Sequence, residues 1–245
     1  MKITLIRHAT SLINIGGTKF LLDPIFYSKG TLSPANGGKM VNNPLVDIDF
    51  KNDTLNSIDA ILVTHPHRDH LDEKVLEIYG PDVEIICPSF YKDKISELGF
   101  KKVLPIEASL QYKDINIKLT KARHGIGEIE KLMGESFGFV LNSSNNENLY
   151  ITGDTVWCTE IEEVLNTEKP EHIIAYAGNA VLNGNKITMG KEDIGEILTH
   201  TEKSIILPIH LEAWNHCILE RKELKDMDDK IIVLKDGESI EFNQM

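Results

Sequence analysis

A group of potential metal ligands stands at the end of a predicted buried strand in this chain. Residues 59–64 form a short apolar run with high β-propensity, and the string His-Pro-His-Arg-Asp-His follows at 65–70. Neutral imidazole and carboxylate are ligands that hold Zn²⁺, Mn²⁺ or Fe²⁺. Because Pro66 disfavours a helix through His65, we expect a tight loop here, with Asp69 and His70 opening a helix. A solvated polar loop is the plain structural alternative, and metal binding is the working hypothesis.

Three more polar residues stand just beyond predicted strands. They are His124 after residues 115–122, Asp154 after 149–152 and His210 after 204–209. Taken singly, a loop histidine is more often hydrogen-bonded within the fold than bound to a metal. Their shared setting at strand ends favours one common site with residues 65–70.

Charge and composition restrict the class of partner. The chain has 245 residues and a net charge of −12, with no compensating basic run, which weighs against nucleic acid and anionic membranes. The first residues are interrupted by charge too soon for a signal peptide, and no run of about eighteen apolar residues occurs. We therefore expect a soluble, cytoplasmic protein with a small-molecule partner. Its oligomeric state stays open, a homo-oligomer included.

The cysteines do not suggest a disulfide framework. Cys87, Cys158 and Cys217 are far apart in the sequence and odd in number. Cys87 is expected to be a buried strand thiol. A ligand role for Cys158 or Cys217, which lie near Asp154 and His216 in the sequence, is left open but disfavoured.

The predicted secondary structure mixes α/β alternation in the first half with antiparallel strands in the second. A Gly-Gly turn at 16–17 predicts a hairpin, and the Pro- and Gly-containing segment 23–57 reads as a long loop that could cover a pocket. No flexible linker interrupts the chain, so we expect one domain over residues 1–245. Predicted strands cover 3–6, 11–15, 19–22, 59–64, 84–87, 102–104, 111–121, 137–141, 149–152, 172–175 and 204–209, with two more at the C-terminus. Predicted helices cover 72–79, 89–98, 159–165 (opened by a capping box from Thr159 to Glu162), 191–199 and 221–227.

The ordered set of motifs resembles the metal-binding motifs of the metallo-β-lactamase fold superfamily of hydrolases. Local features at 7–10, 153–157 and 210–217 are similar to a branch that includes ascorbate-6-phosphate lactonase-like and N-acyl-phosphatidylethanolamine phospholipase-like proteins. The resemblance covers essentially the whole chain. It implies an α/β fold, a four-layer αββα sandwich of two mixed β-sheets flanked by helices, with the site at one edge.

The resemblance also implies a dinuclear centre holding two divalent metal ions, with Zn²⁺ favoured and Mn²⁺ or Fe²⁺ compatible. Asp154 would bridge the ions, and a metal-bridging hydroxide would be the nucleophile. Thr64, Asp72, Thr152 and Thr155 are candidates to orient the ligands, although Asp72 could equally be a helix cap. The implied ligands are His65, His67 and His124 on one ion and Asp69, His70 and His210 on the other.

Two further histidines are candidates for a catalytic role alongside Asp69. His8 follows the first predicted strand and could contact substrate or donate a proton, although Arg7 stands where related sequences usually have glycine. His216 lies shortly after His210 and could line the pocket. Structural roles are the alternative for both.

The function expected from these observations is metal-dependent hydrolysis of a small ester, lactone or phosphoester. A non-catalytic metal-binding or sensing module is the main alternative. A nuclease is disfavoured by the acidic composition. A diiron oxidoreductase on the same scaffold generally has glutamate at the position of His67, and β-lactam hydrolysis is disfavoured without an export signal.

Overall fold

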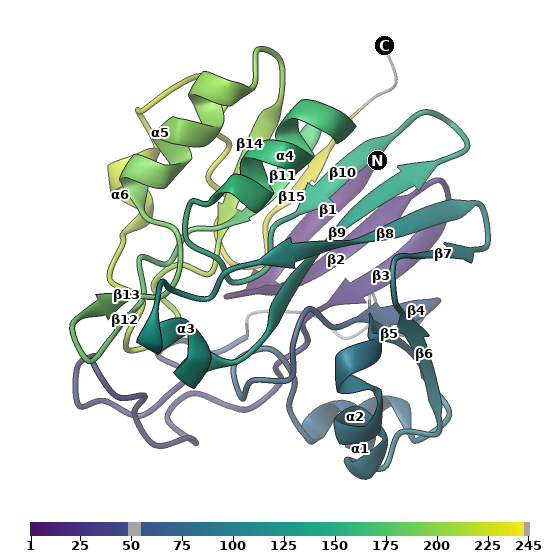
Figure 1. Cartoon of the computed structure of the whole chain (residues 1–245). Coiled ribbons are helices and arrows are strands. Elements are labelled where there is room, and N and C mark those ends of the chain that lie inside the picture. The colour runs from purple at the N-terminus through teal and green to yellow at the C-terminus, as the bar shows by residue number, and fades with distance from the viewer. Residues whose placement is uncertain (49–54, 243–245) are drawn as a thin grey trace.

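The computed structural model describes residues 1–48 and 55–242, and its strands form two large mixed sheets (Figure 1). Part of the predicted 23–57 loop, residues 49–54, lies outside the described residues. The first sheet has the order β15-β1-β2-β3-β4-β5-β6, and the second has the order β14-β11-β10-β9-β8-β7. The first sheet comprises β1 (Lys2–Arg7), β2 (Thr10–Ile15), β3 (Thr18–Leu22), β4 (Ala60–Leu62), β5 (Glu84–Pro88), β6 (Lys102–Ile106) and β15 (Ser239–Glu241). The second comprises β7 (Ser109–Tyr112), β8 (Ile115–Ala122), β9 (Ser136–Ser143), β10 (Asn148–Ile151), β11 (His172–Tyr176) and β14 (Ile205–Ile209).

Helices cover the outer faces of both sheets (Figure 1). Helices α1 (Lys74–Tyr79) and α2 (Lys92–Glu97), the latter after the 3₁₀ turn η2 (Ser89–Tyr91), lie on the first sheet. Helices α4 (Thr159–Glu168) and α5 (Lys191–His200) lie on the second. The short helices α3 (Glu128–Met133) and α6 (Arg221–Leu224) and the small hairpin of β12 (Val181–Leu182) and β13 (Asn185–Lys186) complete the described elements.

The period-2 alternation of the strands explains the four layers. Leu62 packs between the two sheets, whereas its neighbour Ile61 packs beneath the α1 and α2 layer. Likewise Ile174 faces the other sheet and Ile173 faces α4 and α5. Because successive side chains point to opposite faces, each central strand contributes to two cores. The predicted αββα sandwich is confirmed.

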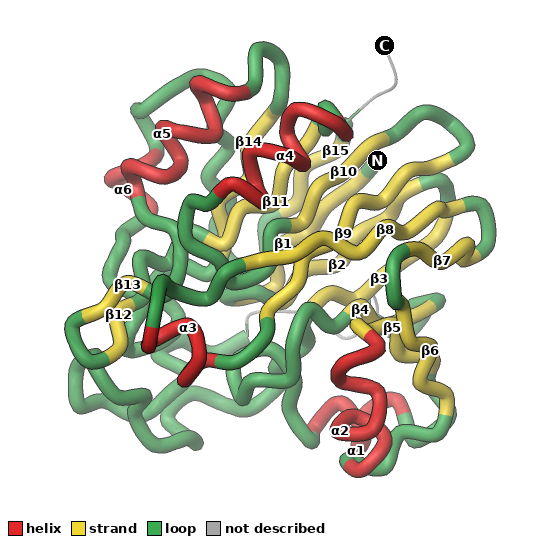
Figure 2. The backbone as a smooth tube through the Cα atoms, viewed as in Figure 1, coloured by secondary structure: helices red, strands yellow, loops and turns green. Residues whose placement is uncertain are grey.

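Strand direction collects the functional residues at one edge. The β1, β3 and β4 strands run in one direction within the first sheet, because β1 pairs antiparallel with β2, β2 antiparallel with β3, and β3 parallel with β4. The β8, β10 and β14 strands likewise share a direction in the second sheet. The backbone N–H of His210 donates to the carbonyl of His8 at 3.0 Å and joins the two sheets where β1 and β14 end. Loops gather at this edge, on the lower side of Figure 2.

Several element predictions need correction. The helix after the histidines begins at Lys74, and His70 sits in a turn in which its N–H donates to the carbonyl of His67. The predicted strand 111–121 is a hairpin broken at Lys113, which has a φ of 50°. Helix α4 begins as predicted, but Cys158 is its N-cap and no side chain caps it, so Thr159 does not form a capping box.

The C-terminal prediction is also partly wrong. Of the two strands expected there, only β15 forms within the described residues. Ile231 makes an isolated bridge to Ile206, so this segment pairs with the second sheet without extending into a strand. Helix α6 ends at Leu224, short of the predicted Met227. Among the described residues, no helix is long and apolar enough to cross a bilayer.

Candidate metal centre

The predicted ligand loop is held rigidly behind β4. The N–H of Val63 donates to the carbonyl of Ile86 and continues the parallel pairing one residue past the strand. A turn then brings the N–H groups of His70 and Leu71 to the carbonyl of His67, at 2.9 and 3.0 Å. His65 and His70 are completely buried, so their side chains point into the protein and not into solvent.

The seven predicted ligand side chains converge at the shared edge of the sheets. Ligand atoms of His65, His67 and His124 lie within 4.8 Å of one another, and so do those of His65, His70 and Asp154. A further group with the same spacing brings Asp69, His70 and His210 together with His8. The structure therefore brings together every residue proposed as a ligand, in groups that match the two predicted metal positions.

Asp154 lies between these groups. Its Oδ2 atom is 3.3 Å from Nε2 of both His70 and His124 and 3.9 Å from Nε2 of His65. Its Oδ1 atom is 3.4 Å from Nε2 of His210. Burial alone would raise the pKa of this carboxyl, but the surrounding imidazoles outweigh burial and hold the pKa well below its usual value. Asp154 is therefore an ionised carboxylate in the position expected of a bridging ligand.

In three of the predicted ligand histidines, the second ring nitrogen, Nδ1, has a partner outside the cluster. His65 Nδ1 lies 3.0 Å from Thr64 Oγ1, and His124 Nδ1 lies 2.7 Å from the carbonyl of Ile187. His210 Nδ1 lies 3.4 Å from the thiol sulfur of Cys217. A proton held on Nδ1 leaves the Nε2 lone pair free, which is the usual arrangement of a ligating imidazole.

Asp23 supports the ligand histidines, although the sequence analysis did not predict it as a site residue. Its Oδ2 atom lies 2.9 Å from His70 Nδ1 and accepts hydrogen bonds from Thr64 Oγ1 and Tyr176 OH. Its Oδ1 atom accepts from the N–H of Thr64 at 2.8 Å. The signal was present, because Asp23 directly follows the buried β3 strand, as the predicted ligands follow theirs.

Buried polar atoms without partners show that the cluster fits a cation. Among the described residues, Nε2 of His65, His70 and His210 and Oδ1 of Asp154 are buried and have no hydrogen-bond partner. Unpaired buried donors and acceptors are costly, so such a concentration in one place calls for a compensating group. Burial lowers the pKa of His65 well below its usual value and that of His124 to about 4, which keeps both rings neutral. This donor set suits divalent transition metals.

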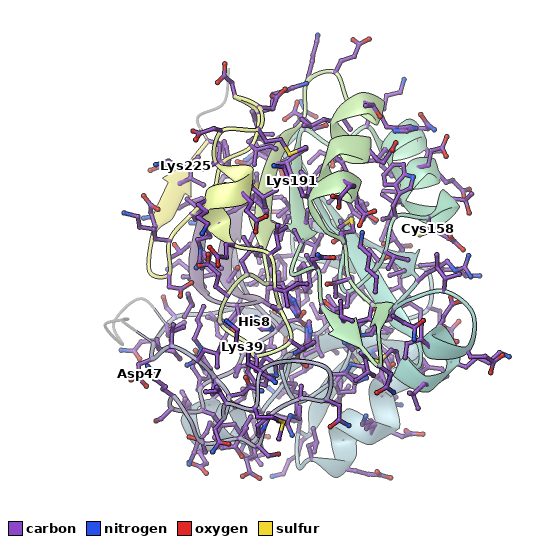
Figure 3. The ribbon with its side chains drawn as sticks, turned by 90° about the vertical axis from the view of Figure 1, so that its left-hand side faces the viewer. His8, Lys39, Asp47, Cys158, Lys191 and Lys225 are labelled. Carbon is purple, nitrogen blue, oxygen red and sulfur yellow. The ribbon has the colours of Figure 1, made fainter. Side chains whose placement is uncertain are left out.

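His8 lies among the predicted ligands, next to Asp69, His70 and His210. It is 1% exposed, and its ring centroid is 3.8 Å from that of His210 and 5.3 Å from that of Trp214. Its Nε2 atom is 3.6 Å from Oδ2 of Asp69. Figure 3 views this side of the molecule and labels His8 together with Lys39 and Asp47 of the long loop.

A cavity of about 480 Å³ opens over the cluster. His67, Asp69, His124 and Asp154 reach its wall, and His216 lines it as predicted. Much of the remaining wall is apolar, and it comes from four separate segments of the chain. These residues are Pro34, Ala35, Met133, Leu182, Ile187 and Trp214.

The loop after Asp23 does form part of this pocket, as the sequence suggested. Pro34 and Ala35 line the cavity. Asn215 holds the loop in place: its Oδ1 accepts from the N–H of Ala35 and from Asn43 Nδ2, and its Nδ2 donates to the carbonyls of Ala35 and Lys39. Asn215 itself is buried behind the loop and acts as its anchor.

The other predicted orienting residues have mixed roles. Asp72 accepts hydrogen bonds from the N–H groups of Phe26 and Tyr27 and so supports the loop after Asp23. The hydroxyl of Thr152 accepts a hydrogen bond from the backbone N–H of Tyr176. The hydroxyl of Thr155 accepts one from the backbone N–H of Arg123, the residue before His124. These contacts fix strand ends, whereas Thr64 alone of the four contacts a predicted ligand ring.

Comparison with known proteins agrees with this site. The family model described as a beta-lactamase superfamily domain matches residues 18–211. The chain is 35% identical to the UPF0173 protein YddR of Bacillus subtilis, over 99% of this chain and 100% of that protein. It is 23% identical to a UPF0173 metal-dependent hydrolase of Pyrococcus furiosus over 99% of this chain and 100% of that one.

Solved structures give the same result. A possible metal-dependent hydrolase from Veillonella parvula superposes with a TM-score of 0.93 at 29% identity, covering 98% of each chain. An isothiocyanate hydrolase from Delia radicum gut bacteria superposes with a TM-score of 0.92 at 30% identity, covering 99% of each chain. These similarities place the protein among the metallo-β-lactamase fold hydrolases. The chain belongs to the beta-lactamase superfamily, in the group of metal-dependent hydrolases named UPF0173.

Proposed function

We propose that this protein hydrolyses a small ester, lactone or phosphoester at a centre of two divalent metal ions. His65, His67 and His124 would hold one ion, and Asp69, His70 and His210 the other, with Asp154 shared. The observation that carries the proposal is the set of unpartnered Nε2 and carboxylate atoms buried at the floor of an open cavity. Zn²⁺ suits this histidine-rich set best, and Mn²⁺ or Fe²⁺ is compatible.

When bound, divalent ions in such a site supply a water activated at neutral pH and polarise the oxygen of the scissile group. The chain itself supplies position and environment. The carbonyl of Ile187 and the side chains of Thr64, Asp23 and Cys217 hold the imidazoles in a fixed orientation, so the donor set is organised before the substrate arrives.

The cavity wall determines how the substrate lies. Trp214, Met133 and Ile187 exclude water from one side of the reacting group, which strengthens electrostatic interactions within the site. Asp69 and His216 are the two candidate catalytic side chains that line the cavity. Burial lowers the pKa of His216 to about 4, so near neutral pH it is an uncharged group able to hydrogen-bond a substrate oxygen. His8 is assigned to the support of Asp69, because it does not line the cavity.

A direct test measures metal content and turnover together. The purified parent would be assayed with 4-nitrophenyl butyrate, a δ-lactone and bis-4-nitrophenyl phosphate, before and after chelation. Asp69→Ala and Asp154→Ala are the test variants, and Asp82→Ala, at an exposed position, is the matched control. We expect chelation and both test variants to abolish turnover of at least one substrate and the control to retain it. A parent that binds metal but turns over no substrate would favour a sensing module.

A second candidate reaction is hydrolysis of a small organic isothiocyanate. The isothiocyanate hydrolase noted above shares 30% identity with this chain along almost its whole length. The apolar part of the cavity would suit the uncharged organic group of such a substrate. Loss of benzyl isothiocyanate absorbance in the same assay separates this reaction from ester hydrolysis, because each substrate is followed by its own signal.

A further inference from the structure

A second cavity of about 790 Å³ adjoins the one over the metal centre. Both are lined by His67, Lys94 and Met133, so they form one continuous groove. The outer part runs between η2 and α2 on one side and α3 on the other. A substrate held at the metal centre therefore has space for an arm that extends past His67.

The outer groove offers apolar surface. Phe90 is 66% exposed, and Tyr91 and Met133 lie beside it in the wall. A ligand that covers such an exposed aromatic side chain is stabilised in its complex by about 25 cal/mol per Å² of apolar surface removed from water. The arm of the substrate is therefore expected to have an apolar portion.

Most charges along the groove are already paired. Arg123 donates to Glu130 at 2.8 and 2.9 Å, and Lys131 pairs with Glu128 at 2.7 Å. Arg68, which reaches only the inner cavity, is held by the carbonyl and hydroxyl of Ser33.

Lys94 differs from these cations. Within residues 1–48 and 55–242, no carboxylate pairs with its ammonium, and its one described contact is with the face of the Tyr91 ring, 5.9 Å from the centroid. It lines both cavities, at the point where they meet. Glu135, for which the described residues show no ion pair, lines the outer cavity but not the inner one. In a chain of net charge −12, an unpaired cation beside the reaction centre is a local site for an anion.

We propose that the substrate carries an anionic group, such as a carboxylate, which Lys94 binds while an apolar portion lies along Phe90 and Met133. Lys94 is then a specificity-determining residue for the reaction. This inference rests on the proposed hydrolytic function, because it orients the scissile bond toward the metal centre and the anion toward α2. Lys94 is an exposed side chain with freedom to reach its ligand, so the ammonium acts as a point charge.

The test compares two esters with the same leaving group. One is 4-nitrophenyl butyrate, which is neutral, and the other is mono-4-nitrophenyl glutarate, which ends in a free carboxylate. Lys94→Ala should lower kcat/KM for the glutarate ester about tenfold and leave the butyrate ester unchanged, as expected for loss of one charge-assisted contact. Lys94→Arg should restore most of the preference. Lys92→Ala, at an exposed lysine of the same helix that lines neither cavity, is the control and should change kcat/KM for neither ester.

Equal losses for both esters in Lys94→Ala, or no loss for either, would overturn the assignment while leaving hydrolysis intact. If the parent cleaves neither ester, ester hydrolysis fails and the binding site is tested separately. Calorimetry on metal-loaded protein would then compare 4-phenylbutyrate with its uncharged amide. A preference for the anion that disappears in Lys94→Ala supports the site. The Lys94 site is rejected if the parent does not prefer the anion. It is also rejected if the preference persists in Lys94→Ala, as it would if the metals bound the carboxylate.

Discussion

Oδ2 of Asp23 lies 2.9 Å from Nδ1 of His70 and 2.7 Å from Oγ1 of Thr64, whose oxygen in turn lies 3.0 Å from Nδ1 of His65. One buried carboxylate oxygen thus orients His70 directly and His65 through a hydroxyl. These two imidazoles belong to different predicted metal positions. Asp23 therefore couples the geometry of the two positions, although it binds neither ion in the proposed arrangement.

Replacing Asp23 with asparagine should weaken metal binding at both positions. The amide keeps the volume but has one acceptor oxygen in place of two, so it cannot serve the Thr64 N–H, the Thr64 hydroxyl and His70 together. We expect about a 10–100-fold loss of metal affinity, the effect usual for partners of ligating histidines. Competition with a chromogenic chelator measures it. Tyr176→Phe removes one donor to Asp23 and is the graded control, and it should cost much less. An unchanged affinity in Asp23→Asn would contradict the role.

Replacing Asn215 with alanine should release the loop that walls the cavity. The change removes four side-chain hydrogen bonds, to Ala35, Asn43 and Lys39, and leaves the buried side-chain amide of Asn43 without its acceptor. We expect a loss of about 2–3 kcal/mol in the free energy of unfolding and faster trypsin cleavage after Lys39. KM should rise more than kcat falls, because the metal ligands are untouched.

The control for this loop is Asn42→Ala. Asn42 donates one exposed hydrogen bond to the carbonyl of Gly30, so its loss should change stability by no more than about 0.5 kcal/mol. Equal cleavage rates at Lys39 in Asn215→Ala and the parent would show that other contacts hold the loop.

A pH effect is expected at Asp59, which joins the two halves of the sandwich. Its Oδ2 accepts from the N–H of Lys19 at 2.8 Å, and its Oδ1 pairs with Lys113 Nζ at 2.5 Å. Partial burial would raise the pKa of Asp59, but Lys113 and the Lys19 N–H outweigh burial and lower the pKa below its usual value. Because the pKa of Asp59 is lower in the folded protein than in the unfolded chain, its carboxylate stabilises the fold at pH values above the unfolded pKa of about 4. This stabilisation is lost as the pH falls through the pKa of the folded state.

Urea unfolding of the parent and Asp59→Asn between about pH 3 and pH 7 tests this coupling. The parent should lose its advantage of about 1 kcal/mol over the variant as pH falls below about 4. A difference that is constant across this range would show that the carboxylate charge contributes nothing.

The sequence predicted the metal site better than it predicted the surrounding chain. The ligand residues follow buried strands, and strand direction alone brings such positions to one edge, so His124, Asp154 and His210 could be grouped from the sequence. Asp23 also directly follows a buried strand, but it is the first residue of the predicted long loop 23–57, so it was not grouped with the ligands. The roles of Asn215 and Lys94 depend on contacts between segments far apart in the chain, which no local pattern encodes.

Local elements were mispredicted where tertiary contacts outweigh propensity. The hairpin at Lys113 depends on a left-handed backbone conformation, which lysine rarely adopts and which sequence therefore does not signal. Helix α1 begins later than predicted because a separate turn precedes it. In this turn the carbonyl of His67 accepts hydrogen bonds from the N–H groups of His70 and Leu71. The C-terminal segment at Ile231 pairs for too short a distance to form a strand.

The proposed function depends on the binding of two divalent metal ions by the buried His and Asp cluster. Inductively coupled plasma mass spectrometry of the purified protein measures this binding, with Asp154→Ala as the test variant and Asp82→Ala as the surface control. We predict about two equivalents of transition metal per chain in the parent and in the control, as expected of a two-metal site, and less than one in Asp154→Ala. A parent that carries no more metal than Asp154→Ala after incubation with Zn²⁺, Mn²⁺ or Fe²⁺ would show that the cluster is not a metal centre.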